Sequence, residues 1–403
     1  MHALSIIRDF LGTYCNEMHS KRQSALAKAV EASIVGGLGV VKMAKVLLSQ
    51  ASLRHRIKCC DRLLSNPRLT KDSLSIYTAL AHRIIGERRT VGVIVDWSPL
   101  RKDSSAQLIR AAVIVKGRAF TIYEEVYRLR VLGAMTPHRR FMKNLRQVLP
   151  NGCQPVIITD SGFRGTWFKL LDKLGFVWLG RIRNRDMVRP AHHKTDWAGC
   201  KTLYLKARGQ VRDLGHYEYA KSNPVACRMV LSKRPRKGRT KKTKMGQKAR
   251  SRASQKNAAC NREPWLLAAS KKLDSVSAET LVQLYSGRMQ TEQTFRDLKC
   301  PQWGMGLRTS QTKKLHRLAN LLLIAALAAY ALWLIGLAAK GANVVVQYGS
   351  RQKAATTSSI LTLARYWIDP SNWPDRSKRP QLGKSQLKEA LVVLRSMVFT
   401  YEK

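Results

Sequence analysis

One stretch of the chain, residues 91 to 183, restricts the fold more than any other part of the sequence. Strands are expected in VGVIVDWS and in the two halves of LIRAAVIVKGRAFTIYEEVY, because these runs are rich in β-branched residues and Lys116-Gly117 marks a turn. The next segments predict a helix in HRRFMKNLRQVL, a strand in PVIITDSG, a helix in GTWFKLLDKLG that Gly175 closes, and a strand in FVWLGRIR. The predicted order is therefore β-β-β-α-β-α-β, an α/β fold in which three strands meander and two are reached through helices.

Residues 1 to 85 are predicted to be helical. Apolar residues recur there at steps of three and four in SALAKAVEASIV, VVKMAKVLL, IKCCDRLLS and LSIYTALAHRII, and Gly36-Gly37 and Asn66-Pro67 interrupt the pattern. Basic residues such as Arg54 punctuate the segment. A small helical DNA-binding domain fits this composition, and a merely solvated basic face fits it equally well.

Residues 184 to 280 break the α/β alternation and are expected to form a β insertion, with short strands in TLYLKA, VACRMVLSK and PWLLAAS. Inside it, residues 233 to 252 carry eleven Lys or Arg and no acid. Such a run repels itself too strongly to pack, which predicts a loop that orders on phosphates or serves only as a solubilising tether. Residues 281 to 340 should complete the core begun by residues 86 to 183. Residues 341 to 403 should form a C-terminal helical region that is a candidate for dimerisation.

The charge balance predicts a polyanionic partner. The chain has 73 Lys or Arg against 25 Asp or Glu, a formal net charge of +48. An excess of this size cannot be neutralised within the molecule, and nucleic acid is the usual polyanion that relieves it. The eight cysteines show no Cys-x-x-Cys and no zinc-ligand spacing, so reduced thiols in a cytoplasmic protein are expected. The first residues show no secretory signal.

The segment from Leu321 to Ala339 contains no charged side chain. Its length meets the requirement for a transmembrane helix. It is rich in Ala and stands alone in the chain, and a helix that is apolar all round also suits the centre of a large core. We expect a buried core helix and no membrane association.

Two acids stand at the ends of predicted buried strands, Asp96 in VGVIVDWS and Asp160 in PVIITDSG. A carboxylate at the carboxyl end of a strand lies at the sheet edge where ligands collect in open α/β folds. It is costly to bury there without a counter-charge, and a divalent cation would supply one. The alternative is an acid that caps the following turn or helix, which is common for Asp-Ser.

A third acid, Glu292, is surrounded by cations on one face of a predicted helix. A continuous helix over residues 285 to 299 places four side chains within about 60° of Tyr285 around the axis. They are Arg288, Glu292, Arg296 and Lys299, and Asp297 falls outside this face. Such a Glu is usually part of an intrahelical salt bridge. A carboxylate ringed by cations also describes a phosphodiester site, where the acid binds metal and the bases bind phosphates.

The carboxylates of Asp96, Asp160 and Glu292 would together suit Mg²⁺, which prefers oxygen ligands and keeps several waters, with Mn²⁺ as a substitute. Two ions per site are expected. In such a site one ion activates the attacking water or 3′-hydroxyl and the other stabilises the leaving oxygen. Asp96 would bridge the two ions, and Asp160 and Glu292 would each hold one.

The spacing Y-x2-R-x3-E-x6-K is filled by Tyr285, Arg288, Glu292 and Lys299. The stretch YSGRMQTEQTFRDLKCPQWGMGLRTS closely resembles the signature of the insertion-sequence-4 family of bacterial DDE transposases, of the Tn-ten type and, more distantly, the Tn-five type. VDWSPLR, ITDSGF, KSNP and EPWLLA resemble the same family in the same order, so that the resemblance covers nearly the whole chain. It implies a ribonuclease H-like catalytic core with a β insertion before the glutamate helix, which agrees with the order of elements predicted above.

The resemblance also implies a reaction and its partners. The enzyme would cut and rejoin the ends of a mobile element through DNA hairpin intermediates. It would act as a homodimer on paired terminal inverted repeats and on target DNA. A bacterial, cytoplasmic and nucleoid-associated location follows.

Individual DNA contacts are implied as well. Tyr285, Arg288 and Lys299 would contact the DNA backbone near the cleaved end. Trp265 would stack on a base flipped out during hairpin formation, and the alternative is a tryptophan buried in a strand. The remaining candidates are basic: Arg296 in the helical stripe, and Lys241 and Lys242 in the run from 233 to 252.

Three other functions compete with this interpretation. A nuclease with the same fold would cut branched or hybrid nucleic acid without strand transfer, and inverted repeats flanking the gene would argue against it. A noncatalytic basic protein that compacts DNA or associates with ribosomes would need no divalent metal and would tolerate Asp96→Asn. A membrane-anchored basic protein would not dissolve without detergent.

Overall fold

The computed structural model describes residues 3–183, 186–192, 196–233, 243, 245–247, 249–252, 254–255, 258–259, 263–302, 304–342, 359–373 and 382–401. The chain divides into two compact units. The first unit comprises Met1–Cys153 and Met289–Thr400, and the second comprises Gln154–Arg288 and Tyr401–Lys403. Lys241 and Lys242, predicted as DNA contacts, lie outside the described residues, as does much of the basic run around them.

The amino-terminal part of the first unit is helical, as predicted. Its helices are α1 (Ala3–Tyr14), α2 (Ser20–Gly36), α3 (Val40–Val46), α4 (Leu53–Ser65) and α5 (Pro67–Ile85). Both predicted interruptions are confirmed. Helix α2 ends at Gly36, and Gly37 follows with a φ of +84°, which glycine adopts without strain. Asn66 caps α5 by accepting a hydrogen bond from the Arg68 N–H, and Pro67 takes the first helical position, where no N–H is needed.

A meander of antiparallel strands follows in the first unit, formed by β1 (Gly92–Pro99), β2 (Ala106–Val115) and β3 (Arg118–Arg128). Strand β2 lies between the other two and is buried along its whole length. A 3₁₀ turn, η1 (Leu129–Val131), and helix α6 (Met135–Val148) come next. Phe141 and Leu145 are among the buried residues of α6, as its amphipathic pattern predicts.

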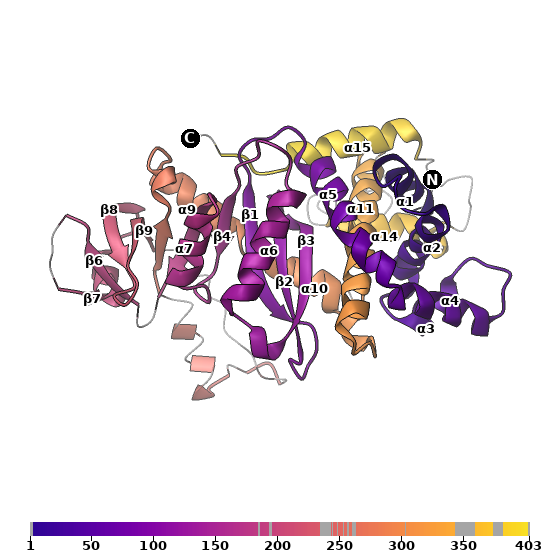
Figure 1. Ribbon diagram of the computed structural model, residues 1–403, viewed down its shortest axis with the longest axis horizontal. Helices are drawn as coiled ribbons and strands as arrows, with labels where there is room; N and C mark the ends of the chain where they lie inside the picture. The colour runs from indigo at the N-terminus through magenta and orange to yellow at the C-terminus, as the bar shows by residue number, and fades with distance from the viewer. Residues whose placement is uncertain are drawn as a thin grey trace. The chain divides into compact units, whose positions relative to one another are not determined.

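The core of the first unit is built around one apolar helix, α11 (Leu315–Gly341). It packs against β3 and against helices from both ends of the chain: α1, α2, α4, α5, α14 (Ile360–Ile368) and α15 (Lys384–Ser396) (Figure 1). Within the described residues, α11 is long and apolar enough to cross a membrane, and α2 with α3 qualifies only as one span bent by 95°. In the most apolar stretch of α11, 94% of the residues are buried. This burial agrees with the predicted core helix.

The second unit begins with the parallel strands β4 (Val156–Thr159) and β5 (Val177–Ile182), joined through α7 (Gly165–Lys173). The predicted order of elements from β1 to β5 is thus confirmed along the chain. Strand β10 (Trp265–Ala269) pairs with β5, and the sheet continues through β9 (Val225–Ser232), β8 (Arg212–Tyr219), β6 (Met187–Pro190) and β7 (Ala198–Gly199). The pairings from β5 to β7 are all antiparallel. The helix α9 (Ala278–Gly287) follows β10 and the 3₁₀ turn η3 (Lys271–Leu273).

One predicted strand of the insertion is wrong. TLYLKA lies mostly in a 3₁₀ helix, η2 (Cys200–Lys206). In a strand Leu203 and Leu205 would lie on the same face, but in the 3₁₀ helix Leu203 is buried and Leu205 is 87% exposed. Strand β8, in contrast, is not predicted from the sequence, because a bulge at Gly215 interrupts its alternating pattern.

The continuous helix expected over residues 285 to 299 is also wrong. Helix α9 ends at Gly287, and α10 (Gln290–Lys299) begins after a break at Arg288 and Met289. Glycine is a weak helix former, and the Arg288 N–H bonds to the Tyr285 carbonyl in a tighter 3₁₀ turn. Tyr285 therefore lies on α9 and Glu292 on α10.

Candidate active site

Asp96 was predicted at the carboxyl end of its strand, and that placement is wrong: Asp96 lies inside β1, which continues to Pro99 because residues 97 to 99 also pair with β2. The meander carries a row of charged side chains at this point. Asp96 is half-buried and stands opposite Arg110 of β2, which in turn stands opposite Glu124 of β3. Arg110 and Glu124 are buried, and their ion pair measures 2.5 Å from Nη2 to Oε1. The Tyr77 hydroxyl of α5 donates to the second Glu124 oxygen at 3.2 Å. Burial raises the pKa of Glu124, and these partners oppose the rise by stabilising its charged form.

Lys299 of α10 is buried beside this row. The residue is only 6% exposed. Its ammonium donates to the Ser98 hydroxyl and lies 4.8 Å from the centre of the Phe295 ring. Burial lowers the pKa of Lys299 to about 8, and Asp96 acts in the opposite direction. Lys299 is therefore an internal cation that interacts electrostatically with Asp96.

Glu292 stands in the first turn of α10 and is exposed. Helix α10 packs against β1 and β3, and Phe295 is one of its buried residues. The Thr294 hydroxyl donates to the Ala119 carbonyl of β3 at 2.9 Å. A carboxylate near a helix N-terminus is favoured by the helix dipole. The first unit thus carries Asp96 and Glu292 on two elements that pack against each other.

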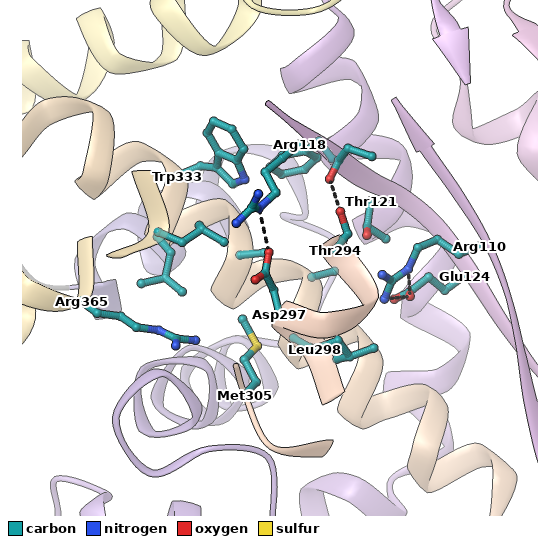
Figure 2. Close-up of a pocket in the computed structure, with 17 residues that line it drawn as sticks. Arg110, Arg118, Thr121, Glu124, Thr294, Asp297, Leu298, Met305, Trp333 and Arg365 are labelled. Atoms are coloured by element: carbon teal, nitrogen blue, oxygen red, sulfur yellow. Dashed lines mark hydrogen bonds and ion pairs between the residues drawn. The ribbon is translucent and has the colours of Figure 1, made fainter. Parts of the chain in front are cut away.

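A pocket lies along the side of α10 that bears Asp297. Figure 2 shows Arg118 reaching Asp297, with Nε 3.0 Å from Oδ2. Burial raises the pKa of Asp297, and Arg118 opposes that rise. Trp333 of α11 and Arg365 of α14 also line the pocket, whereas Asp96 and Glu292 do not. Asp297 is therefore held in an ion pair inside the first unit.

The second unit gathers three of the motif residues around Tyr285. Asp160 directly follows β4, is half-buried, and accepts the Gly162 N–H on Oδ1 at 2.8 Å. Tyr285 is 2% exposed, and its ring lies edge-on to that of Trp265 with centroids 4.8 Å apart. The Arg288 guanidinium carbon is 5.9 Å from the same ring. Burial raises the pKa of Tyr285, Arg288 lowers it, and Asp160 adds to the rise, so the four side chains interact within one site.

The predicted DNA contacts differ in exposure. Arg296 is exposed on α10, whereas Trp265 on β10 and Arg288 are half-buried. Tyr285 and Lys299 are buried. A buried side chain reaches DNA only through neighbours, so the exposed and half-buried residues are the ones that can touch a phosphate or a base directly in this conformation.

Sequence reasoning missed the buried charges next to Asp96. Arg110 and Glu124 are charges inside strands that are otherwise apolar, LIRAAVIV and FTIYEEVY. Because buried charges are paired, two opposite charges in neighbouring strands of a meander are candidates for a cross-strand ion pair. The two opposite charges can be recognised in the sequence. The strand register that places Arg110 opposite Glu124 cannot.

The three predicted acids are divided between the units, with Asp96 and Glu292 in the first and Asp160 in the second. Among the described residues, no three His, Cys, Asp or Glu side chains are grouped as a metal site would require. The donor chemistry nevertheless fits a hard cation. All three are carboxylates, and none is fully buried, so a metal ion held by them could keep the water ligands that Mg²⁺ requires.

A family model described as a transposase DDE domain matches residues 87–332. The match covers more than half of the chain and includes β1, β4 and α10, the elements that carry or directly precede the three acids. A comparison with curated proteins found no match. The class defined by the family model is that of DNA-acting DDE enzymes, which generally use divalent metal ions. The chain belongs to the transposase DDE domain family, and it is an enzyme that acts on DNA.

Proposed function

We propose that this chain is a cut-and-paste transposase of the insertion-sequence-4 type with a ribonuclease H-like core. It nicks each end of its element by hydrolysis, and the freed 3′-hydroxyl attacks the opposite strand to make a hairpin. The hairpin is reopened and the ends are joined to target DNA. The observation that carries this proposal is the family match over residues 87–332, which spans Asp96, Asp160 and Glu292 together with the Y-x2-R-x3-E-x6-K spacing.

In this proposal Asp96, Asp160 and Glu292 hold two Mg²⁺ ions, with Mn²⁺ as a substitute. Bound there, the metal would activate the attacking hydroxyl and stabilise the leaving oxygen. The carboxylates would orient the ions, and Lys299 would offset part of the negative charge that Asp96 and an incoming phosphate bring together. The buried position of Lys299 beside Asp96 supports this role, in place of a direct phosphate contact.

Trp265, Tyr285 and Arg288 serve the DNA end. The edge-on contact of Tyr285 with Trp265 supports a role for Tyr285 in holding the half-buried indole, which would stack on an unstacked base. Arg288 would bind a phosphate with its fork of donors. Arg296, Lys241 and Lys242 would add electrostatic attraction to the backbone.

The wider assembly is also part of the proposal. Residues 1 to 85 would bind the terminal inverted repeats, and residues 341 to 403 would support a homodimer that pairs two ends. The net charge of +48 supports extended contact with DNA and a place in the bacterial nucleoid.

The test uses a labelled DNA fragment that carries the sequence flanking the coding region, incubated with the full chain and Mg²⁺. Glu292→Gln should lower the cleavage rate by about a hundredfold or more, since a lost metal ligand removes several kcal/mol of transition-state stabilisation. Glu279→Gln is the matched control, because Glu279 is also exposed in the first turn of a helix. Equal cleavage by wild type and Glu292→Gln would overturn the site assignment, and cleavage without joined products would favour the nuclease.

A further inference from the structure

Three arginines and a tyrosine meet where the end of α5 contacts α1 and α15 in the first unit. Arg83 belongs to the last turn of α5, Arg88 follows that helix, Arg395 lies on α15, and Tyr14 ends α1. The arginines are half-buried, and Tyr14 is 43% exposed. We call these four residues the arginine-tyrosine cluster.

The geometry holds the guanidinium groups together over Gly86. Arg395 Nε donates to the Arg83 carbonyl at 2.8 Å, and Arg88 Nη1 donates to the Ile85 carbonyl at 3.2 Å. A Cβ on Gly86 would lie 3.8 Å from Arg88 Nη1 and 3.8 Å from Arg395 Nε, so both groups flank the same backbone atom. Two like charges are therefore kept close to each other by the last carbonyls of α5.

Arg83 joins this pair to the aromatic side of the cluster. Its guanidinium carbon lies 5.0 Å from the centre of the Tyr14 ring. Tyr14 in turn packs beside Phe10, with ring centroids 5.7 Å apart. The Tyr14 ring is thus held by Phe10 and lies next to the Arg83 guanidinium. An aromatic ring beside a cation is a combination that proteins use to bind bases or sugars.

Among the described residues, the cluster has no acidic partner. Within the part of the chain that the structure describes, none of the three arginines forms an ion pair. Burial lowers the pKa of Arg88, and Arg395 lowers it further. The carbonyls at the end of α5 accept a hydrogen bond from one N–H of Arg88 and from one N–H of Arg395. Each guanidinium has five N–H donors. Arg83 is also hydrogen-bonded to the Tyr330 hydroxyl of α11. These contacts leave further donors on Arg88 and Arg395 for a ligand.

We infer that the arginine-tyrosine cluster is a binding site for the phosphodiester backbone of DNA, separate from the residues proposed for cleavage. A phosphate would take the donors that the α5 carbonyls leave, and its charge would relieve the mutual repulsion of the arginines. The Tyr14 face would pack on the adjoining sugar or on an unstacked base. This inference deepens the proposed function, because it adds a contact that holds the DNA substrate.

The test measures DNA affinity of the full chain against salt concentration by fluorescence anisotropy, with a duplex carrying the flanking sequence. Each lost phosphate contact lowers the slope of log affinity against log salt by about 0.9. Arg88→Gln combined with Arg395→Gln should lower it by about 2. The matched control is Arg89→Gln combined with Lys388→Gln, which removes the same charge from exposed positions on the same two segments. An equal loss of slope in both double variants would overturn the inference.

Further variants separate binding from folding and from chemistry. Arg88→Lys combined with Arg395→Lys keeps the charge and should keep the salt slope, so a full loss of slope in this variant also overturns the inference. Tyr14→Leu should weaken binding severalfold at constant salt slope, and unchanged affinity would remove the tyrosine from the site. If inorganic phosphate alone raises the melting temperature of wild type but the DNA slope never changes, the site binds free phosphate and the DNA assignment is wrong.

The cluster and the proposed function fail in different ways. A wild-type chain that binds DNA through the cluster and never cleaves it would refute the proposed function alone. A chain that cleaves with an unchanged salt slope in the double variant would refute the cluster alone.

Discussion

Replacing Lys299 by Met should make the chain more stable at neutral pH. Lys299 is 6% exposed, and its pKa falls from 10.5 to about 8 because of burial. Each pKa unit corresponds to about 1.4 kcal/mol, so the charged form of Lys299 costs the folded state about 3 kcal/mol. Methionine has a similar length and no charge, but it leaves the Ser98 hydroxyl without this donor, at a cost of about 1 kcal/mol. The net gain in the free energy of unfolding at pH 7 should be about 2 kcal/mol.

The pH dependence gives the sharper assay. Between pH 8 and 10.5 the unfolded chain holds a proton on this lysine that the folded chain has lost, so the wild type gains stability as pH rises through that window. Below pH 8 the penalty is complete and constant. The difference in free energy of unfolding between Lys299→Met and wild type, from urea titrations, should therefore be largest at pH 7 and shrink above pH 8.

Lys143→Met is the control for this experiment, because Lys143 is exposed on α6. Its effect should stay within about 0.5 kcal/mol. A Lys299→Met variant that is less stable than wild type at pH 7, or a difference that does not depend on pH, would refute the argument. Lys299 would then be held in its charged form by Asp96 and Glu124 more strongly than burial opposes it.

Three further predictions concern stability. His138 is buried, and its Nε2 accepts a hydrogen bond from the Trp97 indole N–H at 3.0 Å. Burial lowers the pKa of His138 to about 4, so only the unfolded state takes up a proton between pH 7 and pH 5. The free energy of unfolding should therefore fall by about 2 kcal/mol over this range. His138→Phe should abolish that loss in urea titrations at the two pH values, and an unchanged pH dependence would contradict it. In Gly336→Ala the new Cβ would clash with the Ile360 carbonyl of α14, which should cost about 1–3 kcal/mol. In Gly12→Ala of α1 the new Cβ meets nothing within 4 Å, so this variant should gain about 0.5–1 kcal/mol. Thermal melting of the two variants tests the contrast, and equal shifts would refute it. Arg228 donates to three backbone carbonyls between residues 273 and 276, and the closest contact is 2.6 Å long to Val276. Arg228→Ala removes these hydrogen bonds and should lower the free energy of unfolding by about 3 kcal/mol. Amide hydrogen exchange should rise first around the start of α9. Exchange that rises equally in α11 would contradict this assignment.

Several elements could be predicted because their signals are local. The strand that carries Asp96 and the strand that precedes Asp160 are short apolar runs, and such patterns depend only on neighbouring residues. The buried state of α11 followed from an apolar surface on all sides, since only a membrane or a large core accommodates it. The family match over residues 87–332 agrees with the transposase class inferred from the same motifs.

Other features depend on interactions that a local pattern does not contain. The break between α9 and α10 rests on a single 3₁₀ bond at Arg288, and a helical wheel drawn through Gly287 hides it. From the pattern of its own helix, Lys299 would be predicted to lie on the surface. The packing of α10 on β1 instead buries Lys299 beside Asp96. Long-range register and packing, which decide both cases, have no signature within one segment.

The position of α11 sets the order in which the first unit can mature during synthesis. Helices α1, α2, α4 and α5 leave the ribosome more than two hundred residues before the helix on which they pack. Until Leu315–Gly341 emerges, the inward faces of these helices have no permanent cover, and they are exposed to chaperones and to other nascent chains. A chain that stops before Leu315 therefore retains the amino-terminal helices without the surface that joins them.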